Sequence, residues 1–186
     1  PFLLARFDEA QKGLDWQGRK QLLIALRSQA SPAKAEPLRG YRASGDASAK
    51  AAHEAKAALV FHLLRRTAGE ERFASARKAF TALAREHPVG WDDLRLAFEK
   101  ETGRDLAAFF RQWVDGKGLP DPRIDKPAAK RRGSGYEAVF DVIQPDPAYD
   151  LDLAVEVVLA DGRIKKDTVR VEGSRKRIEI PTDAEP

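Results

Sequence analysis

The chain has 186 residues, enough for one or two domains, and its 42% hydrophobic content is enough to form a core. Its 33 basic and 29 acidic side chains are well mixed and leave a net charge of only +4, which argues against a nucleic-acid-binding protein because such proteins cluster positive charge on one element. The absence of cysteine excludes disulfides and thiolate metal sites, and no apolar run is long enough to span a bilayer.

The first fifty residues divide into a helical part and an irregular part. Residues 2–30 carry an apolar stripe from Leu22 to Leu26 and are predicted to form one or two amphipathic helices. Residues 31–50 are rich in proline, alanine, glycine and serine, and this composition predicts an irregular, mobile surface loop that contains Tyr41. Because the chain opens on Pro1 and contains no methionine, we expect it to be a piece of a longer protein. We also expect it to be soluble, and either cytoplasmic or periplasmic.

The centre of the chain is predicted to be a buried helix. Residues 54–66 place apolar side chains on nearly every face, which is typical of a helix enclosed within a domain, and Gly69 is expected to end it. Apolar residues at helical spacing predict three further helices, over 70–86, 91–100 and 106–114. We expect these helices to cover the central one, with the aromatic residues of the last helix in the core.

A change of period from helical to alternating marks a second domain. Proline, glycine and the basic run Lys130–Arg132 predict an exposed linker at 121–135, between a helical subdomain at 1–120 and a β domain at 136–186. The β domain is predicted to hold about four antiparallel strands in a small sheet or β-sandwich, with a hairpin turn at Asp161-Gly162. The expected fold class is therefore α+β and multidomain.

The histidines provide no metal site that is complete within the chain. His53 and Glu54 begin like the zinc-binding motif H-E-x-x-H, but the second ligand position is occupied by Ala57. His53 and His62 are nine residues apart and point in different directions on a continuous helix, so they cannot share an ion. We expect His62 to be a hydrogen-bonded core residue and predict no metal ligands in this chain.

Four blocks of sequence between about Lys50 and Pro120 follow the order and spacing of a known family. They read K-A-A-L-V-F-H-L-L-R-R continued by G-E-E-R-F, then W-D-D-L-R-L-A-F-E-K, then T-G-R-D-L-A-A-F-F-R-Q-W-V, then G-L-P. Together they resemble zinc aminopeptidases of the alanyl-aminopeptidase (gluzincin) family. The resemblance implies the all-helical rear half of a thermolysin-like catalytic domain, followed by the small β-sandwich domain of that family.

The same resemblance implies that the chain is not catalytic by itself. In the family, the zinc-binding H-E-x-x-H helix and the glycine-containing motif that binds the substrate amine lie upstream of these blocks. The implied partners are therefore the upstream catalytic half of the same chain and, in the parent protein, a peptide substrate, with no nucleic acid. Zinc is expected in the parent and no cofactor in this part.

The sequence departs from the family at the residue that matters most for catalysis here. The family places a tyrosine, whose hydroxyl stabilises the tetrahedral oxyanion, two residues before the position of Lys56, and Glu54 stands there. The family glycine after that lysine is also changed, to Ala57. Either the parent is a degenerate or weakened peptidase, or Tyr41 or another group of the loop substitutes as the donor. The rival interpretation is a non-catalytic scaffold, derived from a peptidase fold, that binds a protein partner.

Overall fold

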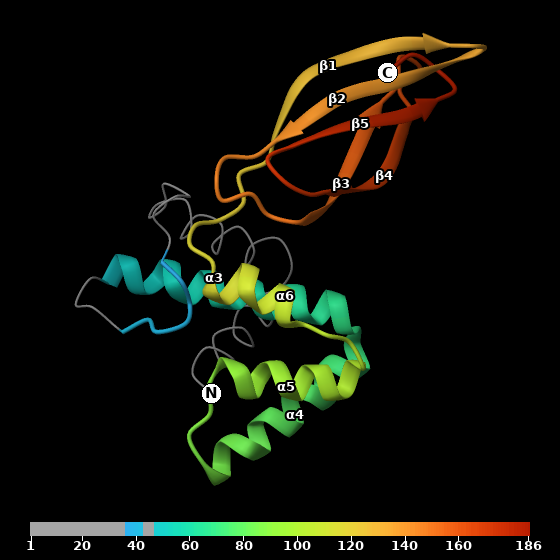
Figure 1. Ribbon diagram of the computed structural model, residues 1–186. Helices are drawn as coiled ribbons and strands as arrows, with labels where there is room; N and C mark the ends of the chain where they lie inside the picture. The colour runs from blue at the N-terminus through green and yellow to red at the C-terminus, as the bar shows by residue number, and fades with distance from the viewer. Residues whose placement is uncertain (1–35, 43–46) are drawn as a thin grey trace. The chain divides into compact units, whose positions relative to one another are not determined.

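A computed structural model describes residues 36–42 and 47–186, and it has an α+β fold (Figure 1). The chain divides into two compact units, one ending at Gly118 and the other formed by Leu119–Pro186. The helices predicted within residues 2–30 lie outside the described residues. None of the helices in the described part is long and apolar enough to cross a membrane.

The central helix is α3 (Ala47–Ala68), and its core face is apolar. The prediction of a helix over 54–66 is confirmed, but α3 begins earlier, so residues 47–50 are helical and not part of an irregular loop. The helix ends where predicted, because Gly69 adopts a positive φ of 80° and its N–H donates to the Arg65 carbonyl at 2.9 Å.

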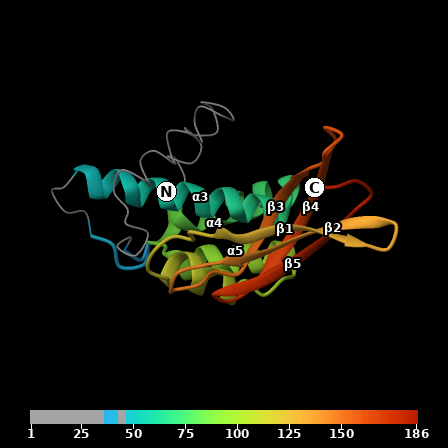
Figure 2. The same ribbon diagram turned by 90° about the horizontal axis from the view of Figure 1, so that it is seen from above.

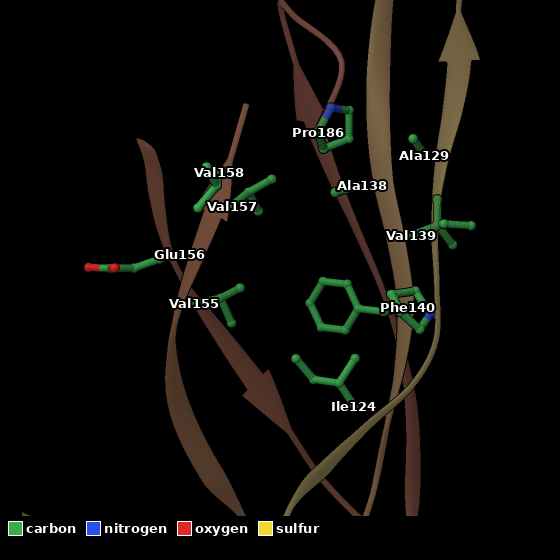
Figure 3. A pocket seen from close by; sticks show the side chains of 12 residues that line it. Ile124, Ala129, Ala138, Val139, Phe140, Val155, Glu156, Val157, Val158 and Pro186 are labelled. Atoms are coloured by element: carbon green, nitrogen blue, oxygen red, sulfur yellow. The ribbon is translucent and has the colours of Figure 1, made fainter. Parts of the chain in front are cut away.

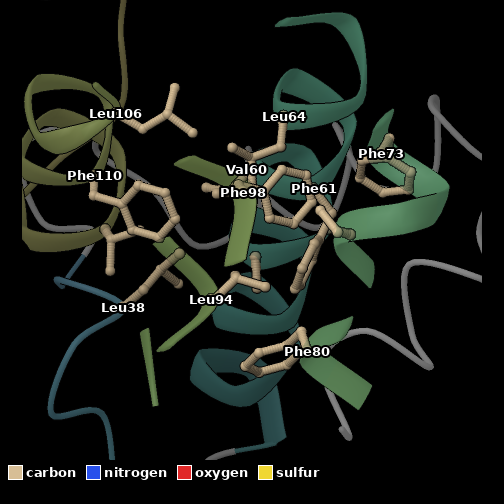
Figure 4. Close-up of a cluster of buried hydrophobic side chains, with 14 residues drawn as sticks. Leu38, Val60, Phe61, Leu64, Phe73, Phe80, Leu94, Phe98, Leu106 and Phe110 are labelled. Carbon is tan, nitrogen blue, oxygen red and sulfur yellow. The ribbon is translucent and has the colours of Figure 1, made fainter. Parts of the chain in front are cut away.

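Three more helical elements complete the first unit. Helices α4 (Glu70–Glu86) and α5 (Trp91–Thr102) match the predicted ranges closely. The last predicted helix is split into α6 (Ala107–Phe110) and the π-helical turn η2 (Arg111–Asp115). Figure 4 shows side chains of α4, α5 and α6 converging on those of α3. The largest fully buried side chains of this unit are Val60, Leu64, Leu94, Phe98, Phe110 and Val114.

The second unit consists of two antiparallel sheets. One has the strand order β1-β2-β5, formed by β1 (Arg123–Arg132), β2 (Gly135–Ile143) and β5 (Arg175–Thr182). The other pairs β3 (Leu151–Val158) with β4 (Ile164–Val171) across the turn predicted at Asp161-Gly162. Both sheets contribute to one hydrophobic cluster, whose best-buried members are Val142, Leu159, Val171 and Ile180.

The prediction of a linker at 121–135 is wrong, because residues 123–132 form strand β1. This strand pairs antiparallel with β2 from Arg123↔Ile143 to Arg132↔Gly135, and Figure 2 shows the two running side by side. The sequence of β1 contains Pro127 and many charged residues and has no alternating apolar pattern, because the strand is almost wholly exposed. It therefore could not be recognised as a strand from the sequence. It tolerates proline because it lies at a sheet edge and is interrupted by a register shift between Asp125 and Ala128.

Candidate functional site

The first half of α3 differs from the second half in carrying buried polar residues. His53 is 8% exposed and Lys56 is 2% exposed, whereas the buried residues of the following turns are apolar. Charged and imidazole side chains are rarely this well buried unless other groups of the protein satisfy them. This polar cluster includes the position of Glu54, which the sequence analysis singled out, and therefore forms the candidate site.

The Lys56 ammonium is satisfied by backbone oxygens. Its Nζ donates to the carbonyl of Gly116 at 3.0 Å and to that of Glu36 at 3.4 Å. Burial lowers the pKa of Lys56 to about 8, and the Glu36 carboxylate opposes that shift. Lys56 thus joins three separate parts of the first unit: α3, the segment 36–42 and the end of η2.

The segment 36–42 is anchored to the helices in several further ways. The N–H groups of Leu38 and Arg39 both donate to the Val114 carbonyl, at 2.8 and 3.2 Å, and the Leu38 side chain is buried in the core. The Arg39 guanidinium binds Asp115 at 2.5 Å and Asp92 at 2.8 Å. The described part of the predicted mobile loop is therefore a docked strap, and the prediction of a mobile surface loop is wrong for these residues.

The strap brings Tyr41 onto the polar half of α3. Its ring stacks on the imidazole of His53 with the centroids 3.5 Å apart and the planes 18° from parallel. The Tyr41 hydroxyl is buried and accepts or donates no hydrogen bond among the described residues. A buried hydroxyl without a partner retains its capacity to donate to a group that enters the site.

The imidazole of His53 is kept neutral by its surroundings. Burial lowers its pKa to about 4, the positive charge of Lys56 adds to that effect, and a hydrogen bond with the Leu38 backbone opposes it. At neutral pH His53 is therefore an uncharged partner for the Tyr41 ring.

Glu54 lies next to this stack and is half-buried. Its carboxylate faces Lys50, one turn earlier, with Oε1 4.0 Å from Nζ. The structure therefore places Tyr41 against His53, the residue that precedes Glu54 in the sequence, whereas the described partner of Glu54 is Lys50. An ionised carboxylate can only accept hydrogen bonds, whereas the Tyr41 hydroxyl can donate one.

No group of three or more histidine or acidic side chains able to hold a metal ion occurs within residues 36–42 and 47–186. His53 and His62 both lie on α3, as their spacing predicted, and His87 is exposed at the end of α4. The zinc expected in the parent protein stays a prediction.

Sequence reasoning missed the importance of Lys56 and His53. Lys56 was noted only as part of a family block, and His53 was considered only as a metal ligand. One feature of the sequence points to their burial: residues 55–64 leave almost no polar face on the helix, so a lysine within that stretch has to find its partners inside the protein. The partners themselves are backbone carbonyls at distant positions, which no pattern in the sequence reveals.

No protein-family model matches the chain, and no match is found among curated proteins. Among solved structures, the fold is similar to that of aminopeptidase A from Legionella pneumophila, which was crystallised in complex with aspartic acid. The similarity has a TM-score of 0.64 at 15% sequence identity, and it covers 95% of this chain but 20% of that protein. The chain thus spans about a fifth of the length of an aminopeptidase whose fold it shares.

Proposed function

We propose that this chain forms the rear part of an aminopeptidase-like zinc metallopeptidase of the gluzincin type, whose metal-binding helix belongs to an upstream part of the protein. The observation that carries the proposal is the fold similarity, in which nearly the whole chain corresponds to a fifth of an aminopeptidase. The four sequence blocks support it independently, since they follow the family's order from Lys56 to Pro120.

Within this proposal, the polar half of α3 faces the substrate, and Tyr41 is the oxyanion donor. In the family that donor is a tyrosine on the helix, at the position of Glu54 here. A glutamate there would oppose the negative charge that develops on the substrate carbonyl, whereas a phenol hydroxyl would stabilise it. The stacking of Tyr41 on His53 supports the substitution, because it fixes a tyrosine without a described hydroxyl partner on the residue that precedes that position in the sequence.

A second candidate function is a non-catalytic scaffold that binds a protein partner through a peptidase-derived fold. Two observations favour it: Glu54 occupies the family's tyrosine position, and the ammonium of Lys56 is buried and donates to the backbone carbonyls of Glu36 and Gly116. Both features are compatible with a peptidase fold that is kept as a binding scaffold and no longer needs catalytic groups.

The two functions are separated by experiments on the chain together with the sequence that naturally precedes Pro1. For the peptidase we expect about one zinc per chain by elemental analysis and hydrolysis of aminoacyl amides. The Glu54→Tyr variant should then raise kcat with little change in KM, because it removes a carboxylate that opposes the negative charge developing in the transition state. Stoichiometric zinc without hydrolysis by either protein would support the scaffold, and absence of zinc would contradict the peptidase proposal.

A further inference from the structure

An apolar groove runs between the two sheets of the second unit, where β1 and β3 face each other. Its volume is about 340 Å³. Figure 3 shows Phe140 and Ile124 on one side of this groove facing Val155 on the other. Two residues at its rim are unusually exposed for their size, Ile124 at 64% and Val158 at 63%. Apolar surface left open in this way commonly marks an interaction site.

Both strands that flank the groove are sheet edges. Among the described strands, β1 pairs with β2 alone and β3 pairs with β4 alone. The Leu159 N–H donates to the Arg163 carbonyl, so it points toward β4. Along a strand, successive N–H groups point alternately to one neighbouring edge and to the other. The N–H groups of Ala154, Glu156 and Val158 are therefore directed to the free edge of β3, beside the groove.

A stretch of polypeptide already occupies one end of this edge. The Ala160 N–H, which follows in the same alternation, donates to the Glu185 carbonyl at 2.7 Å. Pro186 then lies against the groove near Ala138 (Figure 3). Just beyond the end of β3, this edge thus donates a backbone hydrogen bond to an extended segment, and from Val158 back along β3 the same edge is unpaired among the described strands.

Of the two edges, only β3 is regular enough to add a strand. On β1, Lys126 has a positive φ of 50°, Pro127 lacks an N–H, and the register shifts between Asp125 and Ala128. Such features protect an edge against pairing. Strand β3 has an unbroken register with β4 from Leu151 to Val158 and contains no proline.

The charges around the groove indicate the chemistry of the occupant. Its one charged lining residue, Glu156, points away from the apolar side chains in Figure 3 and binds Lys166 at 2.9 Å. A small ligand would find too few polar groups to orient it. On β1, Lys126 and Lys130 flank the lining residues 127–129 in the sequence, are exposed and form no ion pair with any described residue, so acidic groups are favoured beside the groove.

We propose that the groove between β1 and β3 binds an extended peptide segment of another protein, which adds as a strand to the free edge of β3. The segment alternates aliphatic and polar residues, so that the aliphatic ones fill the groove, and it carries acidic residues that face the cations of β1. This proposal goes beyond the peptidase function and holds whether or not the parent is catalytic.

The test is a titration of the ¹⁵N-labelled chain with the peptide acetyl-Glu-Val-Thr-Val-Thr-Val-Glu-amide, followed by NMR. We expect saturable shifts and slower hydrogen exchange at the amides of Ala154, Glu156 and Val158. A peptide with lysine in place of both glutamates should bind more weakly, and added salt should reduce that difference. Absence of saturable shifts up to about 1 mM peptide, the range of weak binding, would overturn the proposal.

Two variants of cross-strand partners sharpen the test. Val158 and Ile164 are paired between β3 and β4 and are both exposed, at 63% and 52%, but only Val158 lines the groove. Val158→Lys should weaken peptide binding about tenfold, as expected when burial of one valine is lost, while Ile164→Lys should leave it unchanged. Equal effects of the two variants would place the peptide elsewhere and contradict the proposal.

A third variant tests the backbone pairing itself. Ala154→Pro removes an N–H at the free edge and leaves the alternate N–H groups that face β4 in place, so binding should be lost while the cross-strand contacts between β3 and β4 persist. Unchanged binding by a folded Ala154→Pro protein would overturn strand addition. Shifts at the same amides that depend on protein concentration without peptide would instead identify a second copy as the occupant.

Discussion

The helical unit and the β unit depart from ordinary protein packing in different ways. The helical unit buries polar groups: Lys56 and His53 lie inside it and are satisfied by backbone groups and by the Tyr41 ring. The β unit also buries polar residues such as Glu137 and Gln144, but it differs in leaving an apolar groove open between the edges β1 and β3. A buried polar group lowers the stability of the fold unless it is hydrogen-bonded. Apolar surface that stays exposed contributes none of the stabilisation that its burial would give.

The comparison indicates where each unit is adapted for something other than stability. In the helical unit, the second half of α3 is an ordinary packed core, and the exceptions are confined to one turn around His53 and Lys56. In the β unit, the cluster shared by the sheets is ordinary, and the exceptions are exposed apolar residues on β1, β3 and β4, two of which, Ile124 and Val158, line the groove. Departures from the general rules concentrate at functional sites, which is why both proposals are built on them.

The largest expected effect tests the ordinary core. Phe98 is fully buried on α5, and Leu96 on the same helix is exposed. Phe98→Ala should lower the free energy of unfolding of the helical unit by about 3–5 kcal/mol, because it removes a large side chain and leaves a cavity. Leu96→Ala should have little effect. Denaturant titration measures both, and similar losses in the two variants would contradict the assignment of the core.

A smaller loss is expected on removal of the buried ammonium. Lys56→Ala leaves the carbonyls of Gly116 and Glu36 without their donor and should cost about 1–3 kcal/mol. Hydrogen exchange at Leu38 and Arg39 should accelerate, since the strap loses one of its anchors. The matched control is Lys78→Ala on α4, an exposed lysine that should leave both measurements unchanged. Slow exchange in the strap of Lys56→Ala would show that Lys56 does not hold it.

The stability of the helical unit should rise with pH across the range in which His53 loses its proton. The folded pKa is about 4 and the ordinary value is 6.5, so the unfolded chain binds more protons between these values. The free energy of unfolding therefore increases by about 1–3 kcal/mol as the pH rises from 4 to 6.5. Replacing His53 with glutamine should remove this dependence, and an unchanged pH profile in that variant would contradict a buried neutral imidazole.

The smallest effect is expected at the exposed end of the strap. Arg39→Ala breaks ion pairs with Asp92 and Asp115, which are all solvent-accessible. Such pairs contribute about 0–1 kcal/mol, and salt should weaken them further. Thermal unfolding at low and high salt measures the difference, and a loss as large as that of Lys56→Ala would mean that the surface pairs, and not the buried lysine, anchor the strap.

The sequence predicted the elements whose periodicity is strong. Helices α4 and α5 and the strand pair β3–β4 follow from apolar spacing and from turn residues such as Gly162. It failed for β1, because an edge strand that is exposed and contains Pro127 needs no apolar alternation. It also failed for the strap, since Leu38 and Arg39 are fixed by a carbonyl at Val114, far away in the chain.

The candidate site could be predicted only in part. The family resemblance directed attention to Glu54 and Tyr41, and in the structure Tyr41 stacks on His53 while Glu54 faces Lys50, so their role at one site stays a prediction. The burial of Lys56 and the stacking of His53 depend on tertiary contacts with the strap and η2, which have no counterpart in local sequence. The groove beside β3 could not be predicted either, because it depends on which strands remain unpaired.

The central claim is that Tyr41 supplies the oxyanion donor of a peptidase completed by the upstream part of the protein. The most direct measurement is kcat for hydrolysis of an aminoacyl amide by that complete protein and by its Tyr41→Phe variant, which removes only the hydroxyl and keeps the ring on His53. We predict a decrease in kcat of about a hundredfold to a thousandfold with KM nearly unchanged. Equal kcat values for the two proteins would contradict the claim.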